Sequence, residues 1–86
     1  MYKFKKGDKV KVSSKPKEGE DSIWSPEMKK DLLGCIGEID WGEGEGDYLQ
    51  YKITFEKEFI QSGYTRNFWN VEEKFLTLYS PKKKIG

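Results

Sequence analysis

The chain has 86 residues, enough for one domain with a modest core and too few for a second domain. Charged residues make up 36% and hydrophobic residues 35%, which leans towards disorder, but 15% aromatic residues supply core area and indicate a folded domain. No apolar stretch approaches the ~18 residues of a transmembrane helix, and no apolar segment follows the basic start as in a signal peptide. We therefore expect a cytoplasmic protein with no membrane partner, and the single cysteine, Cys35, fits a reducing compartment.

Charge is segregated along the chain although the net charge is only +1. Seven lysines lie in residues 1–17, whereas residues 18–47 are strongly acidic. Such segregation is typical of a solvated face that complements another part of the same fold, and less often marks a partner site. Arg66 is the only arginine among 16 basic residues, which argues against base recognition by arginine forks and fits an AT-rich genome, such as that of a low-GC bacterium or its phage.

The first predicted strand spans residues 8–13, where valines alternate with lysines. Residues 14–22 show no periodicity and are predicted to form a loop. Both segments precede a backbone corner at Gly34 and Gly37, two glycines three residues apart, around which the rest of the chain is organised.

A short helix is expected in the long loop before this corner, over residues 26–33. Ser25 is a good N-cap and Pro26 suits the first helical position. Met28 and Leu32 would then face the core. Such a helix has about two turns and depends on packing for its stability.

The second predicted strand follows the corner and places Ile39 and Trp41 on one face and Glu38 and Asp40 on the other. The next segment, residues 42–47, alternates glycine with acidic residues and superficially resembles a calcium loop. However, Thr54 stands where such a loop requires a bidentate glutamate, so no metal site is predicted.

The clearest predicted strand is residues 48–55, in which alternation brings Leu49, Tyr51, Ile53 and Phe55 to one face. The residues after it, 56–63, are predicted to be a connection that extends the hairpin.

A fourth strand is predicted over residues 64–69, with aromatic side chains on both faces. Because only one face can fill the core, the other stays exposed or is covered by a loop, and this surplus is the strongest sign of a binding site. One helical turn at residues 71–74 and a short last strand at 75–79 complete the pattern. The predicted domain covers residues 1–80.

The predicted fold class is mainly β: a small five-stranded SH3-like barrel with a short helix in the first long loop and a one-turn helix before the last strand. Residues 81–86 are predicted to be a basic flexible tail.

Across most of its length the chain resembles the SH3-like repeat of Mind bomb-type ubiquitin ligases. The motifs that carry the resemblance are, in order, Gly7-Asp8-Lys9-Val10, Trp24, Gly34–Ile39, Tyr51–Phe55, Trp69-Asn70-Val71 and Leu76–Leu78. The resemblance implies an SH3-like barrel that binds short peptide segments of partner proteins. The chain departs from the family in the insert at residues 26–33 and in the longer hairpin near Phe59, so the family's own partner is not carried over.

Catalysis is not expected. The chain has no histidine, and Cys35 has no base of suitable kind beside it in the sequence. No glycine-rich phosphate loop is present, because the glycines near Gly42 alternate with acids. We therefore predict no enzyme activity and no cofactor.

The leading hypothesis is a protein- or peptide-binding module, such as a small phage or mobile-element protein that docks on a host protein. The expected contact residues are aromatics with one arginine, the types enriched at interface hot spots: Trp24, Trp41, Tyr64, Arg66, Phe68 and Trp69. For Trp24, for Trp41 and for one of Phe68 and Trp69, a place in the core is as compatible with the sequence as a place in the contact surface.

The alternative is a small barrel that binds nucleic acid through its N-terminal lysines, with Tyr64 or Phe68 stacking on bases. The lysines are Lys3, Lys5, Lys6, Lys9, Lys11, Lys15 and Lys17. The acidic central segment and the near-neutral net charge argue against it. The oligomeric state is left open.

Overall fold

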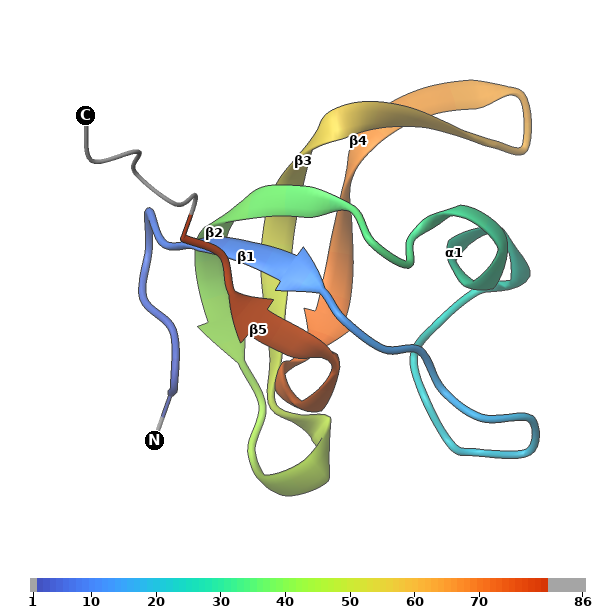
Figure 1. Cartoon of the computed structure of the whole chain (residues 1–86). Helices are drawn as coiled ribbons and strands as arrows, with labels where there is room; N and C mark the ends of the chain where they lie inside the picture. Colours follow the sequence, from blue (N-terminus) through green and yellow to red (C-terminus); the bar gives the residue numbers. More distant parts are fainter. Residues whose placement is uncertain (1, 81–86) are drawn as a thin grey trace.

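Five antiparallel strands form one sheet in the computed structural model, which describes residues 2–80 (Figure 1). The elements are β1 (Lys9–Val12), α1 (Pro26–Asp31), β2 (Ile36–Glu43), the 3-10 turn η1 (Gly46–Tyr48), β3 (Gln50–Gln61), β4 (Tyr64–Glu72), the 3-10 turn η2 (Glu73–Phe75) and β5 (Leu76–Leu78). The mainly β class, the helix in the first loop and the helical turn before the last strand are confirmed. The predicted tail, 81–86, lies outside the described residues.

The strand order is β4-β3-β2-β1-β5, so β4 and β5 are the two edges. Over residues 2–80, β4 and β5 do not pair with one another, so the sheet is open.

The core lies on the inner face of the sheet, as the alternation predicts. Val10 and Val12 of β1 are fully buried, and so is Ile53 of β3. Trp24, in the long first loop, packs edge-on against Phe75 with ring centroids 5.4 Å apart. The loop therefore contributes to the core together with the strands.

Helix α1 begins at the predicted cap. The Ser25 side chain accepts a hydrogen bond from the backbone N–H of Met28 at 3.3 Å, and Pro26 occupies the first turn. Gly34 follows with a φ of +86°, a conformation that glycine adopts without strain. Met28 and Leu32 are buried as predicted. The helix thereby extends the core beyond the sheet.

The corner residue Gly37 is required by the close approach of β2 to β3. A Cβ atom there would lie 2.6 Å from the Thr54 carbonyl oxygen and 2.6 Å from a methyl group of Ile53. Because the carbonyl belongs to the backbone, no side-chain movement could relieve this overlap.

A β-bulge at Asp40 changes the face on which β2 presents its side chains. Ile39 pairs with Ile53, but the next pair is Trp41 with Lys52, so Asp40 is an extra residue. Ile39 is buried, whereas Trp41 is 47% exposed. The prediction that Ile39 and Trp41 share one face of the strand is therefore wrong, because the bulge turns Trp41 to the outer face.

Residues 56–63 extend the β3–β4 hairpin, as predicted. Strand β3 continues past Phe55 to Gln61, and the chain reverses at Ser62 and Gly63, whose φ angles are +52° and +81°. The β3–β4 register also shifts between Thr54 and Phe59. Figure 1 shows the end of this hairpin extending beyond the other strands on the side of α1.

Candidate functional site

The six predicted contact residues fall into two groups. Trp24 and Trp69 are only 6% and 4% exposed and belong to the core. Trp41, Tyr64 and Phe68 are 47%, 79% and 37% exposed. The two buried tryptophans expose little surface because other core side chains cover them, which leaves the exposed aromatics and the partly buried Arg66 as the main candidates.

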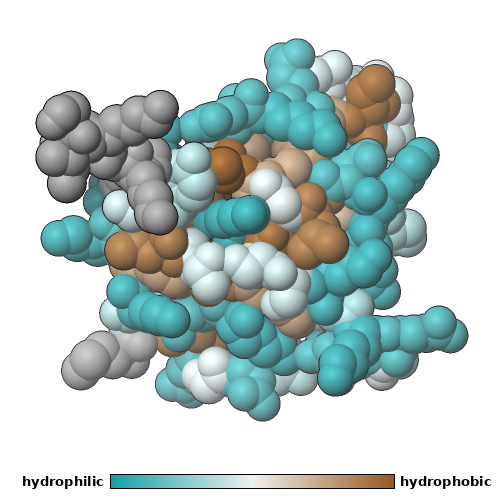
Figure 2. All heavy atoms as spheres, in the orientation of Figure 1, coloured by the Kyte–Doolittle hydropathy of each residue, from teal (hydrophilic) through white to brown (hydrophobic). Residues whose placement is uncertain are grey.

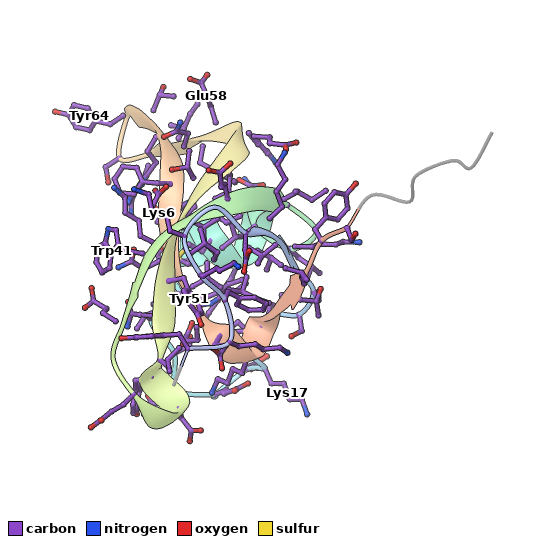
Figure 3. The ribbon with its side chains drawn as sticks, turned by 90° about the vertical axis from the view of Figure 1, so that its left-hand side faces the viewer. Lys6, Lys17, Trp41, Tyr51, Glu58 and Tyr64 are labelled. Carbon is purple, nitrogen blue, oxygen red and sulfur yellow. The ribbon has the colours of Figure 1, made fainter. Side chains whose placement is uncertain are left out.

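The exposed aromatics lie over the outer face of β2, β3 and β4. Trp41 pairs across the strands with Lys52, which pairs in turn with Asn70. The Lys52 ammonium lies 4.8 Å from the centre of the Phe68 ring, a cation–π contact. Figure 3 shows Trp41 and Tyr64 pointing to the same side of the sheet. We call Trp41, Lys52, Tyr64 and Phe68 the outer aromatic face.

The bulge that exposes Trp41 is held by a hydrogen bond. The Thr54 hydroxyl donates to the Asp40 carboxylate at 2.7 Å across the β2–β3 pair. Lys52 was missed by the sequence analysis because its position beside Phe68 follows from strand pairing, which alternation within one strand does not specify.

Arg66 is fixed in place on β4. Its Nε donates to the Phe68 carbonyl at 2.9 Å and its Nη1 to the Gln61 side-chain oxygen at 2.6 Å. The guanidinium also lies 4.2 Å from the Phe68 ring centre and 4.1 Å from that of Trp69. These contacts orient a planar cation on two aromatic rings, and the guanidinium needs little further ordering to bind an anion.

A groove of about 360 Å³ lies beside β4, and we call it the β4 groove. Ile23 and Met28, from the first loop and α1, line it together with Arg66, Phe68 and Trp69 of β4. Arg66 is the only charged residue of its lining. The buried Trp69 indole Nε1 has no hydrogen-bond partner among the described residues.

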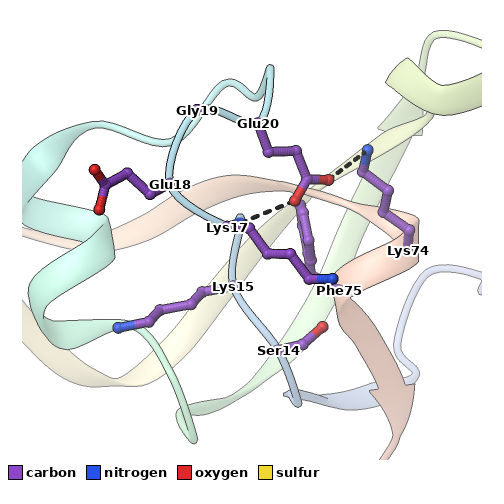
Figure 4. A pocket seen from close by; sticks show the side chains of 8 residues that line it. All are labelled: Ser14, Lys15, Lys17, Glu18, Gly19, Glu20, Lys74 and Phe75. Carbon is purple, nitrogen blue, oxygen red and sulfur yellow. Dashed lines mark hydrogen bonds and ion pairs between the residues drawn. The ribbon is translucent and has the colours of Figure 1, made fainter.

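A larger hollow of about 590 Å³ lies in the first loop, with a mixed charged lining (Figure 4). The Glu20 carboxylate accepts a hydrogen bond from the Lys17 backbone at 2.9 Å and pairs with the Lys74 ammonium at 3.3 Å. Elsewhere Lys9 pairs with Glu56 at 2.8 Å. Hydrophilic side chains surround hydrophobic patches on the face seen in Figure 2. Lysines are thus interspersed with glutamates, which weakens the potential that any run of lysines would present to phosphates.

No cluster of three or more metal-ligating side chains occurs between residues 2 and 80. Partial burial raises the pKa of the Cys35 thiol above its ordinary value, which disfavours the nucleophilic thiolate. No helix in this range is long and apolar enough to cross a membrane.

Comparison with protein-family models, with curated proteins and with solved structures found no match to this chain. The architecture is that of a small domain built on a five-stranded antiparallel β-sheet.

Proposed function

We propose that this chain is a non-catalytic protein- or peptide-binding module that contacts its partner through the outer aromatic face. The observation that carries the proposal is the exposure of Trp41 by the Asp40 bulge, beside Lys52 and Phe68. Bulges are often found where a side chain is re-aimed for function, and tryptophan is the residue type most enriched among interface hot spots.

The finer fold that we propose is an SH3-like barrel. The strand order β4-β3-β2-β1-β5 and the helical turn η2 before β5 support it, as do the bulges that allow β2 and β3 to curve. The resemblance to the Mind bomb-type repeat favours a short peptide segment as the partner.

The nucleic-acid alternative has less support. Lys9 and Lys74 form ion pairs with glutamates. The strands that carry the outer aromatic face have few basic residues, and Lys52 is one of these few. Binding to phosphates would release counterions and weaken steeply with salt, whereas contacts to aromatic side chains would not.

The test is capture of partners from a low-GC bacterial lysate by the tagged protein, at low and at high salt, with and without nuclease treatment. Trp41→Ser removes the exposed aromatic side chain from β2. Leu78→Ser is the matched control, because Leu78 is also exposed but lies on the edge strand β5, two strands away from β2. We expect a discrete protein that Trp41→Ser retains about 10-fold less well than wild type and Leu78→Ser retains unchanged. Recovery only at low salt and only without nuclease would instead identify nucleic acid as the ligand.

A further inference from the structure

The free edge of β4 borders the β4 groove. Among residues 2–80, β4 pairs with β3 alone, and Arg66, Phe68 and Asn70, at alternate positions of β4, all line the groove. The Phe68 carbonyl is accessible from this side because the Arg66 side chain reaches it. An edge strand of this kind presents backbone donors and acceptors that an extended peptide can pair with.

The groove offers a free hydrogen-bond donor. Arg66 uses Nε and Nη1 within the protein, and its Nη2 makes no hydrogen bond to the described residues. A ligand oxygen that enters the groove can accept from this Nη2 in a charge-assisted hydrogen bond. The Trp69 Nε1 also has no partner in residues 2–80, but this atom is fully buried and contributes no accessible donor.

The charge of the groove selects among acceptors. Arg66 is its single charged lining residue, and the guanidinium matches a carboxylate with two parallel hydrogen bonds. Ile23, which is exposed, and Met28 add an apolar wall opposite β4. The site thus combines an apolar wall, a backbone edge and one cation.

We infer that the β4 groove binds an extended acidic peptide segment of the partner, which adds as a strand to the free edge of β4 and places a carboxylate on Arg66. On binding, the guanidinium exchanges the Phe68 carbonyl for the carboxylate, and the carbonyl accepts a backbone N–H of the peptide. This inference rests on the proposed function, because it names the part of the partner that the module recognises.

A different role for Arg66 is protection of the edge, since a charged side chain on an edge strand discourages pairing between copies of a chain. The two roles differ in their consequences. Edge protection predicts that Arg66→Gln makes the protein self-associate, whereas peptide recognition predicts a loss of peptide affinity.

The experiment selects a displayed library of random peptides on the intact protein. We expect enriched peptides to carry Asp or Glu within a segment of strand-forming residues. Arg66→Gln should weaken the best peptide about 10-fold or more. Lys57→Gln is the matched control. Lys57 is exposed and its ammonium also lies over an aromatic ring, 5.4 Å from the centre of Phe59, but it belongs to neither the groove lining nor the outer aromatic face. The change should alter affinity by less than about 3-fold.

Two further measurements keep the test decisive. Arg66→Lys retains the charge without the planar fork and should lose less affinity than Arg66→Gln, which gives a second variant if Arg66→Gln is unstable. N-methylation of alternate peptide amides should abolish binding in one register and spare it in the other, as strand addition requires.

The outcomes separate this inference from the proposed function. Peptides that depend on Trp41 but bind Arg66→Gln as well as wild type would overturn the inference and leave the proposed function standing. Enriched peptides without acidic residues, or a dimer of Arg66→Gln in sedimentation with unchanged peptide affinity, would also overturn it. A library that yields no peptide sensitive to either residue would contradict both.

Discussion

Trp24 and Trp41 occupy opposite environments, and their alanine variants should differ accordingly. Trp24 is buried against Phe75, so Trp24→Ala should lower the free energy of unfolding by about 3–5 kcal/mol. Trp41→Ala, at an exposed position, should lower it by less than about 1 kcal/mol. Urea denaturation of both variants measures the difference. Equal losses would show that one of the two environments is misassigned.

Two isoleucines of β3 provide a second matched pair. Ile53 is fully buried, and Ile53→Ala should cost about 2–5 kcal/mol because it leaves a cavity in the core. Ile60 is 74% exposed, and Ile60→Ala should stay within about 0.5 kcal/mol of wild type. A neutral Ile53→Ala in the same denaturation assay would mean that the register of β3 is incorrect.

Through Tyr51, the free energy of unfolding depends on pH in the alkaline range. The Tyr51 side chain is buried, and its hydroxyl donates a hydrogen bond to the Glu73 carboxylate at 2.5 Å. Burial is the larger cause, and this carboxylate the second cause, of the rise in the pKa of Tyr51 to about 12. An unfolded tyrosine titrates at about 10, so the stability supplied by the neutral hydroxyl is complete below pH ~10 and is lost as the pH approaches ~12.

Tyr51→Phe isolates this contribution from the titration of the lysines. The excess stability of wild type over Tyr51→Phe should be largest below pH ~10 and should decline between pH ~10 and ~12. Denaturation of both proteins across this range measures it. An excess that stays constant through the window would exclude the assigned shift.

Among the elements, the β3–β4 turn is a site where stability can be raised. Ser62 has a φ of +52° and is followed by Gly63 at +81°, the angles of a turn that favours Asn-Gly. Ser62→Asn should therefore raise the free energy of unfolding by about 0.5 kcal/mol, and Gly63→Ala should lower it by about 1 kcal/mol. Thermal unfolding of the two variants should move Tm in opposite directions. If both variants lowered Tm, the turn type would be wrong.

Elements with a strong local signal were predictable from the sequence. Alternation located the buried faces of β1 and β3, and the Ser25 cap with Pro26 located the start of α1. The bulge at Asp40 was not predictable, because residues 38–41 alternate as a regular strand would, and the extra residue becomes visible only in the pairing with β3.

At the scale of the molecule, the surplus of aromatic residues was predictable, but their distribution between core and surface was not. Trp24 and Trp69 became core because the first loop and α1 pack over the sheet, a tertiary arrangement that no local pattern reports. The β4 groove was missed for the same reason: it joins Ile23 and Met28 to residues of β4 that lie about 40 positions later in the chain.

The account depends most on Trp41 being the tryptophan displayed for binding, and 5-fluorotryptophan labelling measures this directly. The three fluorine resonances can be assigned with single Trp→Phe variants, and their shifts on exchange of H₂O for D₂O report solvent contact. We predict a large isotope shift for Trp41 alone, which decreases when the captured partner protein binds. A protected Trp41 in the free protein, or a Trp41 isotope shift that the bound partner leaves unchanged, would contradict the outer aromatic face as the binding surface.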